Sequence, residues 1–123
     1  MQRDDEAIVD YQRAVTLKTG FAAAHNNLGG LLRQRHDYAG ADTAFAAALQ
    51  ADPALVDARY NRALTAMQRG DLPLARALLQ DCLKRAPDHD GARATLVDVL
   101  NDLGERGEAL TLARASAKRL PNS

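Results

Sequence analysis

The 123-residue sequence contains few side chains whose types and spacing could support catalysis or metal binding. Its three histidines, His25, His36 and His89, are scattered and form no His-x-x-x-His pair, the spacing that places two imidazoles on one helix face to bind zinc. No Ser-His-Asp order, phosphate-cradling glycine loop or pair of buried carboxylates emerges from the pattern. We therefore predict that the chain has no metal site, no cofactor and no enzymatic activity.

Two short segments resemble ligand-binding loops only superficially. The stretch "PDHDGA", from Pro87 to Ala92, is acidic like a calcium loop, but no glutamate follows at the required spacing. Asp88 is better placed to cap the next helix. The glycine pair at 29–30 falls within a helical pattern, where short side chains allow close helix contact, so a nucleotide-binding loop is not expected. Cys82, the single cysteine, occupies a small-residue position and is expected to be buried and unreactive.

The composition argues against several kinds of partner. Sixteen Lys and Arg balance 16 Asp and Glu, so no net charge favours a nucleic acid or an anionic membrane as the partner. No apolar run reaches about 18 residues, so no membrane insertion is expected. The first ten residues lack an apolar signal core, and one cysteine cannot form an internal disulfide. We expect a cytoplasmic protein, with a periplasmic location still open if a longer parent chain carries a signal peptide.

Several residue types recur with a fixed period along the chain. Pro53, Pro87 and Pro121 are equally spaced, with 34 positions from one to the next. Small residues recur in the same register, in three sets: Gly29, Ala63 and Val97; Ala41, Ala75 and Ala109; Ala48, Cys82 and Ser116. A fixed period of this length indicates a stack of repeated units, in which each unit buries its apolar face against its neighbours.

Each period contains two stretches with apolar residues at helical spacing. The first helices are expected at Ala22–Arg35, Leu55–Arg69 and His89–Leu103, and the second at Tyr38–Ala51, Leu72–Arg85 and Arg106–Leu120. Asp37 and Asp71 are placed to cap the helices that follow them, and Pro73 falls in a first turn, where its missing N–H costs little. The Ala-, Leu- and Arg-rich composition suits helices and is typical of a bacterial gene of high GC content.

The pattern Leu28-Gly29…Leu32…Ala41…Phe45…Ala48…Pro53 resembles the tetratricopeptide repeat, and the resemblance spans almost the whole chain. It implies an all-α, right-handed α-solenoid of antiparallel helix hairpins. Residues 22–53, 56–87 and 90–121 would form three repeats, and residues 1–20 the second helix of a truncated one, giving seven helices in a single domain, 1–123. Arg59 and Arg62, where the family often has large apolar groups, and Val97, where it has Gly or Ala, imply looser local packing.

The truncated first repeat would leave an apolar surface uncovered. Ala7, Tyr11 and Ala14 match the second-helix pattern one period earlier, and Gly20 offers a helix stop. An exposed patch near Ala7 and Tyr11 would favour a homodimer through the N-terminal helix, or end-to-end stacking.

In tetratricopeptide-repeat proteins the first helices line a concave groove in which partners usually bind. Carried over by position, the groove residues of this chain, called here the predicted groove, are Asn26, Asn27, Gly30, Arg33 and Gln34, then Tyr60, Asn61, Leu64, Met67 and Gln68, and finally Thr95, Asp98, Asn101 and Asp102. The alternative is that these residues are merely a solvated face.

Three features of the predicted groove favour binding. Asn27 and Asn61 occupy the same repeat position, and a ladder of asparagines can donate to and accept from an extended peptide backbone. Tyr60, Leu64 and Met67 add apolar surface of the kind that marks binding sites. Charge grades from Arg33 near the start to Asp98 and Asp102 near the end, which could orient a partner.

The resemblance leads to a protein-interaction scaffold that binds a peptide or helix of a partner protein. Two alternatives stay open: a substrate-docking region excised from a multidomain enzyme such as a glycosyltransferase, and an oligomerisation module. The family members that grip chaperone C-termini use Lys and Asn in one repeat, Asn in the next, then Lys and Arg. Here only Asn61 fits, because Asn26, Gly30, Gly91 and Thr95 occupy the other places, so binding of such tails is not expected.

Overall fold

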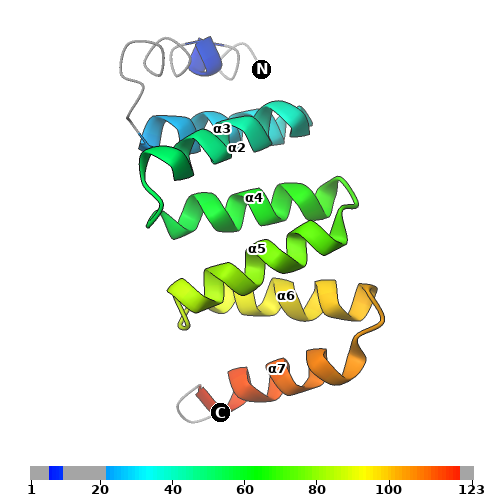
Figure 1. Ribbon diagram of the computed structural model, residues 1–123. Helices are drawn as coiled ribbons and strands as arrows, with labels where there is room; N and C mark the ends of the chain where they lie inside the picture. The colour runs from blue at the N-terminus through cyan, green and yellow to red at the C-terminus, as the bar shows by residue number, and fades with distance from the viewer. Residues whose placement is uncertain (1–5, 10–21, 120–123) are drawn as a thin grey trace.

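The computed structural model describes residues 6–9 and 22–119, and within these ranges the chain is helical with short turns and no β-strand (Figure 1). Residues 6–9 are helical. Six further helices follow: α2 Ala22–Gln34, α3 Tyr38–Ala51, α4 Val56–Gln68, α5 Leu72–Arg85, α6 Asp90–Asp102 and α7 Arg106–Arg119. The predicted bounds of α3 and α5 are confirmed, and α2, α4 and α6 differ from prediction by one residue at an end or at both. The predictions for Tyr11, Ala14, Gly20, Leu120 and Pro121 lie outside the described residues.

The helices form three antiparallel hairpins, α2–α3, α4–α5 and α6–α7, stacked in chain order (Figure 1). Each helix packs against the next, and α2 also contacts α4. Residues 6–9 lie at one end of the stack and α7 at the other. Over the described ranges this is the right-handed, all-α solenoid of seven helices that the sequence predicts.

Side chains cap the starts of three helices, α3, α5 and α6. The Asp37 carboxylate accepts a bond of 3.0 Å from the Gly40 N–H, and Asp71 accepts one of 3.2 Å from Leu74, so both predicted caps are confirmed. The prediction for Asp88 is wrong. The cap of α6 is His89, whose Nδ1 accepts a hydrogen bond of 2.9 Å from the Ala92 N–H. His89 directly precedes the helix, and from this place a side chain reaches the amide three residues further on.

The turn within each hairpin contains one residue in the left-handed conformation. These residues are His36 (φ 66°), Gly70 (φ 84°) and Gly104 (φ 85°), which occupy equivalent places in the three repeats. In every case the following N–H bonds back to a carbonyl five residues earlier, as from Asp37 to Leu32 at 2.9 Å, which is the Schellman ending of a helix. His36 stands where the other two turns have glycine, and its Nδ1 lies 2.8 Å from the Tyr38 hydroxyl.

Close packing within the first hairpin depends on Gly29. A Cβ at this position would lie 2.5 Å from the Phe45 ring, so only glycine lets the fully buried ring pack here. Ala41 and Ala48, on either side of Phe45 along α3, are also fully buried. In the first hairpin, the small residues predicted to allow close helix contact therefore do so.

Arginines at equivalent places in α4 and α6 make buried contacts in the second and third hairpins. Arg59 Nε lies 2.6 Å from Asp81 Oδ2 and forms an ion pair with it. The prediction of looser packing at Arg59 is therefore wrong. Its counterpart Arg93 is only 7% exposed and donates through Nη2 to the Pro87 carbonyl. The residue one period after Asp81 is Ala115, and Arg93 Nε is buried without a hydrogen-bond partner in the described part of the chain.

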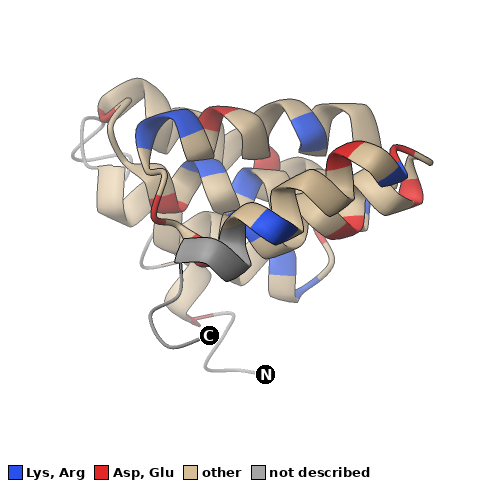
Figure 2. Ribbon diagram, turned by 90° about the horizontal axis from the view of Figure 1, so that it is seen from below, with Lys and Arg blue, Asp and Glu red and all other residues tan. Residues whose placement is uncertain are grey.

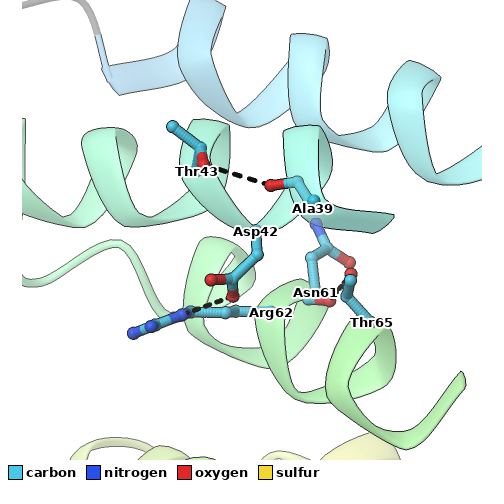
Figure 3. Close-up of polar contacts among 6 residues, drawn as sticks. All are labelled: Ala39, Asp42, Thr43, Asn61, Arg62 and Thr65. Carbon is cyan, nitrogen blue, oxygen red and sulfur yellow. Dashed lines mark hydrogen bonds and ion pairs between the residues drawn. The ribbon is translucent and has the colours of Figure 1, made fainter. Parts of the chain in front are cut away.

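A second ion pair joins consecutive hairpins. Arg62 Nε of α4 lies 2.7 Å from Asp42 Oδ1 of α3 (Figure 3). Both side chains are partly buried, so this contact is less screened than an ordinary surface pair. Here too, an arginine that departs from the family pattern makes a specific contact between helices.

Candidate partner-binding surface

Part of the predicted groove surrounds a cavity of about 330 Å³ on the first-helix side of the stack. The described residues that line it are Ala7, Asn26, Asn27, Gly30, Leu31, Gln34 and Asn61. Four of them are amides and none is charged. Most come from α2, where steps of three and four residues place side chains on one face, and Asn61 comes from α4.

An amide pair bridges the first two hairpins at this cavity. Asn61 Nδ2 donates to Asn26 Oδ1 at 3.2 Å. Asn61 is held on α4, where its carbonyl accepts a 2.9 Å bond from the fully buried Thr65 hydroxyl (Figure 3). Asn27, the residue matched to Asn61 by the repeat period, is exposed instead. The amide contact between the two hairpins therefore has an offset of 35 positions, one more than the repeat period.

The same offset recurs one hairpin further on. The Tyr60 hydroxyl lies 3.2 Å from Thr95 Oγ1, 35 positions later, and the Tyr60 ring lies 4.7 Å from the His89 ring between centroids. A Cβ at Gly91 would lie 3.2 Å from the Tyr60 oxygen, so the glycine leaves room for this contact. Tyr60 is thus half-buried in a junction between α4 and α6, and sequence reasoning missed both His89 and Gly91 as its neighbours.

The remaining predicted groove residues are less concentrated. Met67 packs against the main apolar core, and Leu64 is half-buried. Gln68, Asp98 and Asp102 are exposed. Asn101 lines a separate hollow between α6 and α7. The structure therefore brings together the first-hairpin amides and Asn61, but not the whole predicted set.

The charges near this surface are mixed. Arg33 Nη1 is buried and has no hydrogen-bond partner within residues 6–9 and 22–119. Basic and acidic residues are interspersed along the helices when the stack is viewed end-on (Figure 2). The amide-lined cavity is therefore suited to a polar, uncharged group, with one cation near it on the same helix.

Groups that could support other chemistry are accounted for by packing. His25 is buried on α2, as expected of a packing residue. Cys82 is fully buried, and burial raises the pKa of its thiol to about 11, with Arg59 opposing the rise, so it stays protonated at neutral pH. Among the described residues no three His, Cys, Asp or Glu are grouped to hold a metal ion. Nor does any described helix have the length and apolar character to cross a membrane.

The stacked hairpins and the polar surface along their first helices define a class of helical-repeat proteins. Two tetratricopeptide-repeat family profiles match the sequence, one over residues 26–90 and the other over residues 66–123. The chain belongs to the tetratricopeptide repeat family.

Solved structures with the same fold include two crystal structures of MamA. The first superposes with a TM-score of 0.90 at 21% identity, covering 94% of this chain and 67% of that one. The second superposes with a TM-score of 0.85 at 22% identity, covering 90% of this chain and 61% of that one. The present chain therefore spans about two thirds of the length of these MamA structures, or less. The first TPR of Spaghetti (RPAP3), bound to the HSP90 peptide SRMEEVD, has a TM-score of 0.80 at 17% identity, covering 84% and 82%. A search of curated proteins finds no match.

Proposed function

We propose that this chain is a protein-interaction module that holds an extended segment of a partner protein against the first helices of its hairpins. The observation that carries the proposal is the amide-lined cavity formed by α2 and Asn61. Each side-chain amide offers one acceptor oxygen and two N–H donors, which match the alternating C=O and N–H groups of an extended backbone. The Asn26–Asn61 bond uses only one donor and one acceptor of that set.

The floor of the cavity supports close approach by a main chain. Gly30 lines it, and a Cβ built there would meet no other atom within 4 Å. A glycine at this place lets a partner's backbone lie nearer to α2 than any side chain would. We infer that recognition rests on main-chain hydrogen bonds, with weak preference for particular partner side chains.

Charges beyond the cavity would orient the bound segment. Arg33, which directly precedes the cavity residue Gln34 on α2 and is partly exposed, would favour an acidic group of the segment through its positive charge. Exposed Asp98 and Asp102 on α6 would favour a basic end. The partner segment is therefore expected to be acidic near α2 and basic near α6.

An acidic chaperone tail is not the expected partner, although a structure of the same fold is bound to the HSP90 peptide SRMEEVD. The Lys, Asn and Arg that grip such tails are replaced here at four of five places, by Asn26, Gly30, Gly91 and Thr95. We expect this peptide to show no saturable binding in a calorimetric titration, and micromolar affinity would contradict the assignment of the groove.

The test begins with selection of binding peptides from a displayed random library against the 123-residue chain. Asn26→Ala and Asn61→Ala are then combined in one variant. Binding should weaken by roughly tenfold or more, the change expected from losing one or two buried hydrogen bonds. Gln80→Ala, an exposed amide on α5, serves as the matched control and should bind like the parent.

Main-chain recognition has its own readout. N-methylation of the peptide backbone removes N–H donors without altering side chains, so it should weaken binding to the parent chain more than to the Asn26/Asn61 double variant. Equal loss in both proteins, or an unchanged affinity of the double variant, would contradict the proposal. Circular dichroism checks that each variant keeps its helicity.

A further inference from the structure

One position on the second helix of each unit makes the contact with the next hairpin. It recurs once per period and is occupied by Ile8, Asp42, Arg76 and Leu110. The surface of a hairpin that packs on the following one is called here its C-terminal face, and the surface that receives the preceding one its N-terminal face.

The first two of these contacts have the same register but different chemistry. Ile8, 9% exposed, belongs to one apolar cluster with Leu28 and Ala44 of the first hairpin. Asp42 pairs with Arg62 of the second hairpin at 2.7 Å. Leu28 and Arg62 are one period apart, as are Ile8 and Asp42. The two contacts are therefore equivalent in position, but the first is apolar and the second is an ion pair.

The third residue, Arg76, forms an ion pair outside this register, with α7 and not with Leu96 at the place of Leu28, and the fourth residue is exposed. Arg76 Nη2 lies 3.2 Å from Glu108 Oε1 of the third hairpin. Leu110 is 52% exposed on α7, at the other end of the stack from residues 6–9. A large apolar side chain therefore occupies the contact position on the C-terminal face of the third hairpin.

A hollow of about 300 Å³ lies beside Leu110. Its described lining residues are Val97, Asn101, Arg106, Ala109, Leu110 and Ala113. The counterparts of Ala113 in the first two hairpins are Phe45 and Leu79, which are both fully buried. The third hairpin thus presents a small residue where the others present large ones, and its C-terminal face has room for large apolar side chains from outside.

The chain itself contains the surface that matches. A hairpin packed against Leu110 needs an apolar residue at the place of Leu28, because an arginine there would be buried without its carboxylate. Leu96 also meets this requirement, but it is buried in the core shared by the second and third hairpins. Leu28 remains, flanked by Leu31 and Leu32, on the N-terminal face of the first hairpin.

We propose that the chain associates head to tail with a second copy of itself, the Leu110 face of one copy packing on the Leu28–Ala44 face of the next in the place of Ile8. Among the described residues, a hollow of about 510 Å³ lies on that face, lined among others by Leu28, Leu32 and Ala44. The contact would repeat the register of the Ile8–Leu28 and Asp42–Arg62 contacts within one chain.

Ile8 of the same copy and Leu110 of another copy compete for one site. The fraction of copies with a free face sets the apparent affinity of association. Weakening the internal contact should therefore strengthen self-association, whereas removing Leu110 should abolish it. These opposite effects on the association constant distinguish this contact from non-specific hydrophobic association.

The test is sedimentation equilibrium of the full 123-residue chain over a range of concentrations. The parent chain should associate weakly, and Leu110→Asp should lower the association constant by at least roughly tenfold, because a carboxylate would face leucines. Ile8→Ala should raise the constant several-fold, and the Ile8→Ala/Leu110→Asp double variant should be monomeric. Leu110 is half exposed, so its replacement leaves the folded monomer intact.

Val9→Asp is the matched control, because Val9 is 51% exposed and adjacent to Ile8 but does not belong to its apolar cluster. It should associate like the parent chain. Loss of association in Val9→Asp but not in Leu110→Asp would show a dimer through the N-terminal helix and overturn the proposal. A strictly monomeric parent and Ile8→Ala variant at millimolar concentration would also overturn it.

Discussion

The turn at His36 allows a direct measurement of backbone strain. His36 has φ 66°, and its counterparts Gly70 and Gly104 have φ 84° and 85°. The left-handed region costs a residue with a Cβ roughly 1–2 kcal/mol. Glycine avoids this cost but loses roughly 0.5–1 kcal/mol relative to alanine through its greater freedom in the unfolded chain. The net preference for glycine over alanine at this turn is therefore about 1 kcal/mol.

The His36 side chain offsets part of that strain. Its Nδ1 lies 2.8 Å from the Tyr38 hydroxyl, and the two rings meet edge to face at 5.8 Å. An exposed hydrogen bond of this kind contributes about 0.5 kcal/mol. His36→Gly is thus expected to stabilise the chain by about 0.5 kcal/mol, and His36→Ala to destabilise it by a similar amount.

The two glycine turns provide the matched comparison. A Cβ at Gly70 or Gly104 would meet no other atom within 4 Å, so an alanine there adds backbone strain without a clash. Gly70→Ala and Gly104→Ala should each cost about 1 kcal/mol, or about 4 °C in Tm for a chain of this size. Urea unfolding followed by far-ultraviolet circular dichroism measures all four variants. If alanine and glycine are equally stable at position 36, or if either glycine tolerates alanine without loss, the strain argument is wrong.

Three further predictions concern single buried or capping groups. His89→Ala should lower the free energy of unfolding in urea by about 1 kcal/mol, because the Ala92 N–H loses its acceptor. His89→Asn can accept the same bond and should retain most of the stability. Equal losses in the two variants would contradict the role of His89 as a cap. Ala115→Asp should stabilise the chain by about 1 kcal/mol, because the new carboxylate would accept from the buried Arg93 Nε as Asp81 accepts from Arg59 one period earlier. An unchanged Tm would contradict this prediction. Stability should fall by about 2 kcal/mol as pH rises from 9 to 11. The Cys82 thiol ionises near its ordinary pKa of 9.0 when the chain is unfolded, but only near a pKa of about 11 when it is folded. This fall should be smaller in Cys82→Ala, and identical pH profiles for the two proteins would contradict the assignment.

Features set by local chemistry within one hairpin could be predicted from the sequence. Asp37 and Asp71 cap their helices because a short acidic side chain before a helix reaches the exposed N–H groups. Gly29 faces Phe45 because a small residue opposite a large one is the way two helices approach closely. His89 was missed as a cap because imidazole is an uncommon acceptor there, and Asp88, one position earlier, has the more usual side chain.

Contacts between hairpins were less predictable, because they depend on how far one hairpin slides and tilts against the next. The repeat period pairs Asn27 with Asn61, but the structure joins Asn61 to Asn26, one position further away. Tyr60 and Thr95 follow the same offset. The period aligns equivalent positions, whereas the rotation between hairpins brings neighbouring positions into contact. A search for complementary polar pairs at an offset of 35 positions would have found both bonds.

The third hairpin, which carries Leu110, and the peptide cavity lie at different places along the solenoid. Each hairpin packs mainly on its neighbours, so stability is close to a sum of local terms, and a change at one junction is only weakly felt two hairpins away. The Asn26–Asn61 bond lies at the junction of the first two hairpins, and Leu110 lies on the third. A Leu110→Asp chain should therefore bind a selected peptide with the parent's affinity as a monomer, and the Asn26/Asn61 variant should still self-associate. Association would displace Ile8 from the Leu28 face, and its neighbour Ala7 lines the amide-lined cavity, so displacement of residues 6–9 is the expected link between assembly and peptide binding.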